Sequence, residues 1–311
     1  NEEWISDKTR FVWDGLKTQR LDTPYVRENG KLRPASWDEA FAAIAAKLKD
    51  AKPESIAAIA GDLACAESMK ALKDLFAALG SPNIDCRQDG AKLDAGSRAS
   101  YIFNSTIAGI EDADAILLIG TNPRIEAPII NARILKRARA GGVKIGVVGP
   151  RADLSYDYDY LGAGPQSLKE LGAFADVLKN AERPMIVVGQ GALARADGAA
   201  VLAEAIALAK SVGAVSGGWN GFSVLHTAAS RVAGLDLGLV PGAGGRDVAG
   251  ILDGASKGEI SFVYLLGADE IDMTKLGSAF VVYQGTHGDA GAHRADVILP
   301  GAAYTEKPAT W

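Results

Sequence analysis

The chain has 311 residues, of which 48% are hydrophobic and 23% are charged, and its formal net charge at pH 7 is -5. This composition can bury a sizeable core and excludes a disordered or collagen-like chain, and at about 100–200 residues per domain the length favours two globular units. Basic and acidic residues are interspersed without the basic stripe that a phosphate backbone requires, so nucleic acid is not an expected partner.

Helix and strand signals alternate from the beginning of the chain. Residues 1–35 show little periodicity, so we expect an arm that crosses the surface. A capping box at 36–39 predicts a helix over 40–48. The apolar run 56–61 predicts a strand, and residues 66–79 predict a helix that ends at Gly80.

Four further apolar runs end at glycine and predict strands over 116–120, 144–149, 185–189 and 262–267. They are nearly continuously apolar, as is typical of parallel strands covered by helices on both faces. Residues 198–212 predict a crossover helix, 213–221 a loop, and 236–258 a loop with a short helix at 248–252. The fold class is therefore α/β, with two doubly wound units. All of these runs are far shorter than the ~20 residues of a membrane-spanning helix, so we expect no direct membrane insertion.

Cys65 and Cys86 are the only two cysteines and neither has a cysteine neighbour, so a zinc knuckle or an iron–sulfur cluster cannot be assembled within this chain. Cys65 lies in an apolar helical context, which favours a small buried side chain. Nothing in this pattern requires an oxidising compartment.

Polar residues follow glycine at several predicted strand ends. They are Thr121 and Asn122 after Gly120, Arg151 after Gly149, Gln190 after Gly189, and Asp269 after Gly267. In an open α/β sheet a nucleotide-like ligand binds at such ends, where glycine permits close approach to the backbone. The chain has no Gly-x-Gly-x-x-Gly motif and no P-loop, and glycine is also an ordinary turn residue, so both interpretations stay open.

Other candidate motifs are weaker. His287, Asp289 and His293 could form a metal-binding triad, although loop histidines more often bond to backbone, and His226 stands apart from them. A serine hydrolase has no Gly-x-Ser-x-Gly motif to support it. The tract 153–160 contains three Tyr and three Asp and is either an interface or a solvated turn.

Segments 21–27, 36–40, 120–123 and 295–307 occur in an order that resembles the molybdopterin oxidoreductase superfamily. Within it, segments 1–11, 104–109, 124–128 and 283–289 resemble the large iron–sulfur subunits of respiratory complex I, NADH:quinone oxidoreductase, over essentially the whole chain. The resemblance implies two Rossmann-like units, as in domains 1–3 of formate dehydrogenase and DMSO reductase. It implies an inserted α/β domain at 96–174, a first α/β domain formed by 35–95 and 175–311, and an arm at 1–34 that leads from an iron–sulfur domain.

The resemblance also implies a function. The subunit would belong to a membrane-associated NADH dehydrogenase and translocase that passes electrons from NADH to quinone. Its 2Fe–2S and 4Fe–4S clusters would lie in a preceding part, since we expect this chain, which begins and ends without a start or stop signal, to be a piece of a longer protein. Its partners would be other peripheral-arm subunits, on the cytoplasmic face of a bacterial inner membrane or on the matrix side in mitochondria.

The chain departs from the catalytic molybdenum and tungsten enzymes of the superfamily, which commonly place a Cys, selenocysteine, Ser or Asp ligand shortly after the strand that corresponds to 83–85. Residues 87–96 contain no thiol, Cys86 comes too early, and Asp89 and Asp94 are the remaining ligand candidates. We therefore expect no catalytic residue, metal ligand or cofactor in this chain, which would act as a scaffold. Residues of a vestigial pterin pocket would be Gly120, Thr121, Asn122, Gly149, Arg151, Gly189 and Gln190. The alternatives are a catalytic molybdopterin-dependent oxidoreductase domain with a carboxylate ligand, and a stand-alone nucleotide-binding protein.

Overall fold

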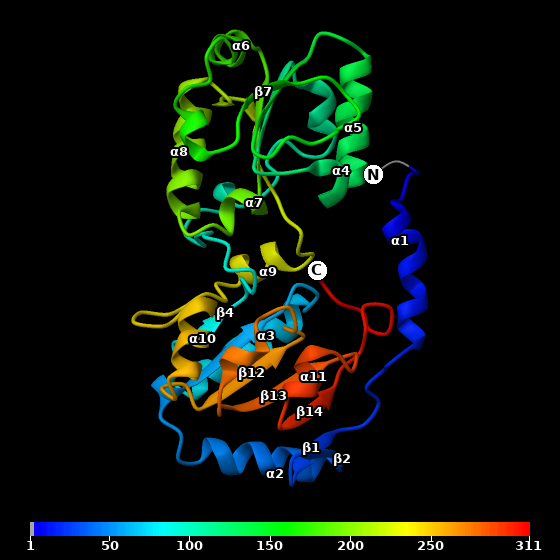
Figure 1. Cartoon of the computed structure of the whole chain (residues 1–311), viewed down its shortest axis with the longest axis vertical. Helices are drawn as coiled ribbons and strands as arrows, with labels where there is room; N and C mark the ends of the chain where they lie inside the picture. Colours follow the sequence, from blue (N-terminus) through cyan, green and yellow to red (C-terminus); the bar gives the residue numbers. More distant parts are fainter. Residues whose placement is uncertain (1–2) are drawn as a thin grey trace. The chain divides into compact units, whose positions relative to one another are not determined.

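The computed structural model describes residues 3–311, whose contacts divide the chain into two compact units (Figure 1). Unit 1 consists of the described residues up to Arg10 and of Ala91–Thr227, whereas unit 2 consists of Phe11–Gly90 and Ala228–Trp311. In sequence, most of unit 1 therefore lies between the two segments of unit 2. Each unit is built on one main sheet.

The main sheet of unit 1 has five parallel strands in the order β11-β8-β5-β6-β7. Their bounds are β5 Ala115–Ile119, β6 Lys144–Val148, β7 Asp159–Gly162, β8 Pro184–Gly189 and β11 Phe222–Leu225. The chain passes through α5 (Pro128–Arg139) from β5 to β6, and through α8 (Gly198–Ser211) from β8 to β11. Figure 1 shows α5 and α8 on opposite sides of this sheet, so the direction of winding reverses between β5 and β8.

Burial explains why these strands are continuously apolar. Every residue of β5 and β8 is buried, and Ile116 and Leu118 pack against Ile130 and Ile134 of α5. Each such side chain stabilises the fold by about 1.5–3 kcal/mol through burial. The shorter elements of unit 1 are η3 Arg98–Ser100, η4 Ala108–Asp112, α4 Pro123–Glu126, η5 Pro165–Leu168, α6 Phe174–Asn180, α7 Gln190–Leu193, β9 Val215–Ser216 and β10 Trp219–Asn220.

The sheet of unit 2 has seven strands in the order β2-β1-β14-β13-β12-β3-β4. Their bounds are β1 Tyr25–Glu28, β2 Lys31–Pro34, β3 Ile56–Ala60, β4 Ile84–Asp85, β12 Phe262–Leu266, β13 Phe280–Gly285 and β14 Val297–Pro300. The five strands from β14 to β4 are parallel, whereas β1 is antiparallel to both of its neighbours. The helices of unit 2 are η1 Val12–Lys17, α2 Trp37–Leu48, η2 Pro53–Ser55, α3 Ala66–Ala78, α9 Arg231–Asp236, α10 Val248–Ser256, η6 Met273–Leu276 and α11 Ala290–Arg294. Helix α1, Asp7–Phe11, lies almost wholly in the first segment of unit 1.

The structure confirms most of the predicted elements. It also confirms the predicted fold class, α/β with two units that are built mainly on parallel strands. All five predicted strands are present, and α2, α3 and α8 match the predicted helices. Ser36 caps α2 by accepting a hydrogen bond from the backbone N–H of Glu39, a contact worth about 1 kcal/mol.

The prediction of a surface arm over residues 1–35 is wrong for its last part. Strands β1 and β2 extend the sheet of unit 2, where Tyr25 lies opposite Ile298 of β14. The hairpin turn is Asn29-Gly30, with φ values of 49° and 79°. An Asn-Gly pair is a strong hairpin signal because both residues tolerate positive φ, but each strand has only four residues and shows no clear periodicity.

Two loop predictions also need correction. Residues 213–221 contain the small β9–β10 hairpin, and the helix predicted at 248–252 is the longer α10, which continues to Ser256. Helix α9 was not predicted at all. It ends at Asp236, so the predicted loop 236–258 is confirmed only between the two helices.

The two units differ from the predicted domain ranges. The predicted inserted domain ends at residue 174, but β8 and β11 pair in the same sheet as β5, so unit 1 continues to Thr227. Periodicity identifies a strand without identifying its neighbours, and this is why the boundary could not be read from the apolar runs.

Candidate functional site

The carboxyl ends of β5, β6 and β8 bring most of the predicted pocket residues together in unit 1. A Cβ added at Gly149 would lie 3.5 Å from the Cα of Gly120, and one added at Gly189 would lie 2.4 Å from the Cβ of Thr121. These ends flank the point where the winding of the sheet reverses, which is the usual ligand position in such folds.

Protein atoms already occupy the space beside these glycines. A Cβ on Gly120, which has φ +58°, would lie 2.6 Å from the backbone nitrogen and the Cβ of Ala192 in α7. A Cβ on Gly191 would lie 2.7 Å from the carbonyl oxygen of Gly120. The missing side chains thus permit α7 to pack on the end of β5, which is the ordinary structural role of glycine.

The polar candidates of this edge bond within the chain. Glu126 accepts hydrogen bonds from the Thr121 hydroxyl and from the backbone N–H of Asn122, both at 2.8 Å. The guanidinium of Arg151 stacks on the ring of Tyr160, with 3.8 Å between Cζ and the ring centroid. These contacts hold the loops after β5 and β6 in place.

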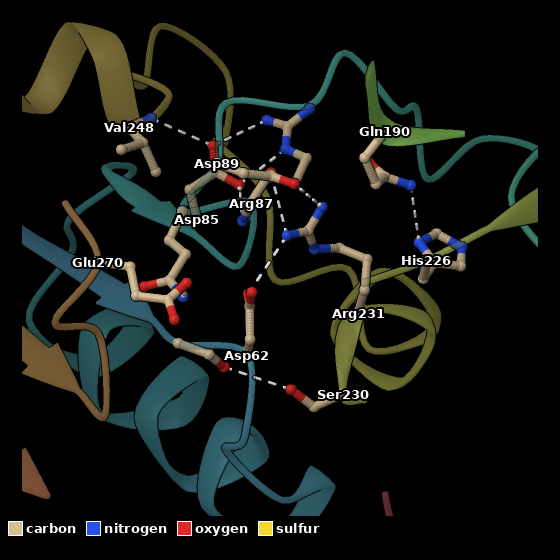
Figure 2. Close-up of polar contacts among 12 residues, drawn as sticks. Asp62, Asp85, Arg87, Asp89, Gln190, His226, Ser230, Arg231, Val248 and Glu270 are labelled. Atoms are coloured by element: carbon tan, nitrogen blue, oxygen red, sulfur yellow. Dashed lines mark hydrogen bonds and ion pairs between the residues drawn. The ribbon is translucent and has the colours of Figure 1, made fainter. Parts of the chain in front are cut away.

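Gln190 is the most buried polar candidate. Its side-chain Nε2 donates to the carbonyl of Leu225 at 3.0 Å and lies 3.4 Å from Nδ1 of His226 (Figure 2). The Nε2 of His226 lies 2.5 Å from the carbonyl oxygen of Tyr101, so this nitrogen carries the proton and Nδ1 is the acceptor. Among residues 3–311, neither Oε1 of Gln190 nor Oδ1 of Asn122 has a hydrogen-bond partner, although both atoms are buried. Buried water commonly satisfies such groups.

At the carboxyl edge of the sheet in unit 2, the buried Arg231 forms an ion-pair network (Figure 2). The guanidinium lies 3.0 Å from Asp89 and 3.4 Å from Asp62, and the Arg231 side chain is 1% exposed. Asp62 follows β3 and Asp89 follows β4, so the two carboxylates come from adjacent strand ends. Ser230 donates to the carbonyl of Gly61 at 3.3 Å and so fixes the start of α9 beside Asp62.

A second buried ion pair lies beside this network. Arg87 binds both carboxylate oxygens of Asp85, at 2.7 and 2.9 Å. Asp85 also accepts from the backbone N–H of Val248, at the start of α10. Gln88 donates to Glu270 at 3.4 Å, and a cavity of about 330 Å³ opens beside Gln88, Asp89 and α10.

The candidate metal ligands of this loop do not fit a molybdenum or tungsten site. Cys86 is 3% exposed, and burial, followed by the charge of Asp85, raises the pKa of its thiol to about 12. Its sulfur packs against α9, where a Cβ added at Gly234 would lie only 2.7 Å from it. Asp89 is bound to Arg231, and Asp94 in unit 1 accepts the backbone N–H of Gly96 at 2.9 Å.

The histidine triad is not formed. His287 lies 2.8 Å from the hydroxyl of Thr286 and 2.8 Å from the carbonyl oxygen of Gly15, which are contacts of a structural loop residue. Over the described range 3–311, no group of three His, Cys, Asp or Glu side chains is arranged to hold a metal ion.

Sequence reasoning missed a pair of carboxyl groups after β12 and β13. The hydroxyl of the buried Tyr283 lies 3.3 Å from Asp269 and 3.2 Å from Asp289. Burial raises the pKa of Asp269 to about 7, with a further contribution from the hydrogen bond and charge of Asp289. The sequence singled out Asp269 after a strand-ending glycine and Asp289 in the proposed histidine triad, but it gave no sign that the two lie together.

Two tyrosines of the tract 153–160 pack internally, whereas its three aspartates are exposed. The Tyr156 hydroxyl donates to Asn131 at 3.0 Å, and the Tyr158 hydroxyl donates to the carbonyl of Ala152 at 2.8 Å. Both rings pack against the core of unit 1. Neither a solvated turn nor an exposed aromatic surface describes these two residues.

Comparison with known proteins identifies the family of this chain. The model of the molybdopterin oxidoreductase family matches residues 20–311. The chain belongs to the molybdopterin oxidoreductase family. In the part of this family member that the structure describes, no helix has both the length and the apolar composition that crossing a membrane requires.

Several relatives of this molybdopterin oxidoreductase family member carry names from respiratory complex I. The chain is 49% identical over 313 residues to a protein of Solanum tuberosum named NADH dehydrogenase [ubiquinone] iron-sulfur protein 1, mitochondrial. It is 48% identical to a protein of Rickettsia bellii that is named as a subunit of NADH-quinone oxidoreductase. Each alignment covers 99% of this chain but only 41% and 44% of the relative, so the chain spans less than half of their length.

Solved structures support the fold of this family member. Acetylene hydratase from Pelobacter acetylenicus superposes with a TM-score of 0.64 at 14% identity, covering 96% of this chain and 57% of that one. A chain of the formyltransferase/hydrolase complex (FhcABCD) from Methylorubrum extorquens also gives 0.64, at 21% identity and with 90% and 86% coverage. At these identities the likeness concerns the fold alone.

Proposed function

We propose that this chain is the molybdopterin-oxidoreductase-like part of a large iron–sulfur subunit of respiratory complex I, and that it acts there as a scaffold without a catalytic centre of its own. The complex-I assignment draws support from the near-50% identity to the two relatives over 99% of the chain. Electron transfer from NADH to quinone would be the activity of the whole complex.

The scaffold role rests on the Arg231 network. The guanidinium of Arg231 lies between the carboxylates that follow β3 and β4 and neutralises them. A buried arginine that is fixed by two carboxylates connects these strand ends and occupies the space between the two carboxylates. The space beside the glycines at the ends of β5 and β8 is likewise occupied by atoms of the chain itself. The pterin pocket suggested by Gly120, Thr121, Asn122, Gly149, Arg151, Gly189 and Gln190 is therefore proposed to be vestigial.

The wider setting follows from the same proposal. The 2Fe–2S and 4Fe–4S clusters would be held by another part of the subunit, since Cys65 and Cys86 are separate and buried. The partners would be the peripheral-arm subunits of the complex, on the cytoplasmic side of a bacterial membrane or the matrix side of a mitochondrial one.

The test compares NADH:quinone turnover per assembled complex in Asp89→Asn, Asp94→Asn and wild-type subunits. A scaffold predicts equal turnover per complex, even where Asp89→Asn lowers the amount that assembles. Loss of turnover in a fully assembled Asp89→Asn complex would refute the scaffold and support the alternative, a catalytic molybdopterin-dependent oxidoreductase domain with a carboxylate ligand.

A further inference from the structure

The hydroxyl of Tyr283 contacts two carboxyl groups, all within unit 2. Asp269 follows β12 and Asp289 directly precedes α11, so only the folded sheet brings them together. The hydroxyl lies 3.3 Å from Asp269 and 3.2 Å from Asp289. Two glycines pack on the side chain of Tyr283, because a Cβ added at Gly285 or Gly291 would lie 2.4 Å from it. This packing fixes the hydroxyl beside the two carboxyl groups.

The hydrogen bonds of this cluster need one proton more than a phenol and two carboxylates possess. An ionised carboxylate only accepts hydrogen bonds, and a phenol has a single proton to donate. Tyr283 contacts both carboxyl groups, and Asp269 and Asp289 also form a hydrogen bond with each other. The bond between the two carboxyl groups therefore requires a proton on one of them. Burial, followed by the hydrogen bond and charge of Asp289, raises the pKa of Asp269 to about 7, which agrees with a shared proton.

The charged and titratable side chains on the elements around the cluster bond elsewhere or point to solvent. His293 of α11 and Lys275 of η6 are exposed. The others have partners of their own: Arg20 pairs with Glu306, Arg294 with Asp296 and Asp62 with Arg231, while Glu270 accepts from Gln88, Asp272 from Thr274, Tyr264 donates to Gln284, and His287 contacts Thr286 and Gly15. A second negative charge in the cluster would therefore have no cation beside it.

The loop that ends at Asp289 also holds the segment that leads into the sheet of unit 2. This loop, residues 286–289, joins β13 to α11, and the segment, residues 15–21, precedes β1. Hydrogen bonds connect the two: the carbonyl of Thr286 accepts from Nε of Arg20 at 3.2 Å and from the backbone N–H of Leu21 at 3.0 Å, the backbone N–H of Gly288 donates to the carbonyl of Gln19 at 2.8 Å, and Nε2 of His287 lies 2.8 Å from the carbonyl oxygen of Gly15. Movement of the loop would break these bonds.

We propose that Asp269, Tyr283 and Asp289 form a pH-sensitive switch, in which a proton shared by the two carboxyl groups keeps loop 286–289 in place against residues 15–21. When this proton is lost to solvent, two carboxylates remain with a single phenolic donor between them. Their repulsion displaces the loop, which carries one of the two carboxylates, from the end of β12. The loop then releases residues 15–21, while the parallel strands of the sheet stay paired.

The direction of the pH effect follows from proton binding. In the closed loop the pKa of Asp269 is about 7, whereas an aspartate that has left the cluster returns to its usual value of 3.8. The closed loop therefore holds a proton that the open loop lacks, and it is held most tightly at acidic pH. Its stability falls as pH rises from about 4 to about 7, by up to about tenfold per pH unit, and changes little above that range.

Hydrogen–deuterium exchange of the purified chain measures the opening of the loop. Protection factors, which are corrected for the intrinsic effect of pH on exchange, are determined at pH 5 and pH 7 for peptides covering 15–21, 286–291 and strand β3. We expect protection of the first two peptides to fall about tenfold or more between these pH values, and to stay well below that of β3. Unchanged protection would overturn the switch. Protection equal to that of β3 would also overturn it, since the loop would then open only with the whole unit.

Two variants assign the effect to the cluster. Asp269→Asn supplies an amide that donates a hydrogen bond without titrating, so protection of the loop should be the same at pH 5 and pH 7. Asp253→Asn is the matched control, because it makes the same change at an exposed position of α10 and should keep the full pH effect. A fall in protection that persists in Asp269→Asn would assign the pH effect to another group, such as His287, and would overturn the proposal.

A further measurement needs no variant. The carboxyl carbons of ¹³C-labelled aspartate in the wild-type chain are followed by NMR as pH is raised. One carboxyl group should titrate near pH 7, together with the loss of protection in loop 286–289. If every aspartate titrates below about pH 5, as in model peptides, no proton is shared and the proposal fails.

Discussion

The variant Arg231→Met removes the cation of the buried network while keeping much of its volume. Asp62 and Asp89 then lose the guanidinium that lies between them, and their side chains are 19% and 26% exposed. Breaking a fully buried ion pair costs about 3–5 kcal/mol, and the partial exposure of the two carboxylates reduces this to about 2–3 kcal/mol. For a unit of this size the melting temperature should fall by roughly 4–12 °C.

The assay is thermal unfolding of the isolated chain, followed by circular dichroism, with the midpoint fitted for each variant. The triple variant Arg231→Met, Asp62→Asn, Asp89→Asn should recover much of the loss, because the two carboxylates that faced the guanidinium are removed together with it. Lys70→Met is the control, since it removes an exposed pair with Asp74 and should change little. An unchanged midpoint in Arg231→Met, or a triple variant less stable than the single one, would refute the electrostatic reasoning.

Three other predictions follow from contacts in the two units. The pKa of Asp269 is raised from its usual value of 3.8 to about 7, so between these two values the folded protein binds a proton that the unfolded chain does not. Stability should therefore fall as pH rises from about 4 to about 7, and unfolding midpoints of Asp269→Asn should lack this fall. Parallel pH profiles of the variant and the wild type would contradict this prediction. Gly120→Ala should destabilise unit 1 more than Gly172→Ala, which has a similar φ of +55° but open space around it; equal melting temperatures would show that the contact with Ala192 costs nothing. Hydrogen bonds with Ser68 and Lys307 lower the pKa of Cys65 in spite of its burial, whereas the pKa of Cys86 is raised to about 12. A thiol reagent at pH 7.4 should therefore modify Cys65 first, which mass spectrometry of the labelled peptides would show. Earlier modification of Cys86 would contradict this order.

The sequence predicts the strands and the longer helices well because their burial leaves a continuous apolar signal. The sequence predicts poorly which strands pair with one another in a sheet. Two predictions failed for the same reason: the end of the inserted domain at residue 174, and the arm in place of strands β1 and β2. Which strands become neighbours depends on long-range contacts, such as Tyr25 opposite Ile298, and these leave no local pattern in the sequence.

In the candidate site, too, local features could be predicted from the sequence and long-range contacts could not. Strand-end glycines could be found from sequence, since a glycine after an apolar run is a local feature. That Ala192 fills the space beside Gly120 depends on the position of α7, which no motif encodes. The Arg231 network was missed because its three charged residues lie on separate segments and meet only in the folded sheet.

The metal and pterin content of the purified chain tests the scaffold most directly. Molybdenum and tungsten are measured by mass spectrometry of the native protein, and pterin by fluorescence after oxidation. The account predicts neither element and no pterin above a few hundredths of a mole per mole of chain. One mole of molybdenum or tungsten per mole of chain, held with pterin, would contradict it.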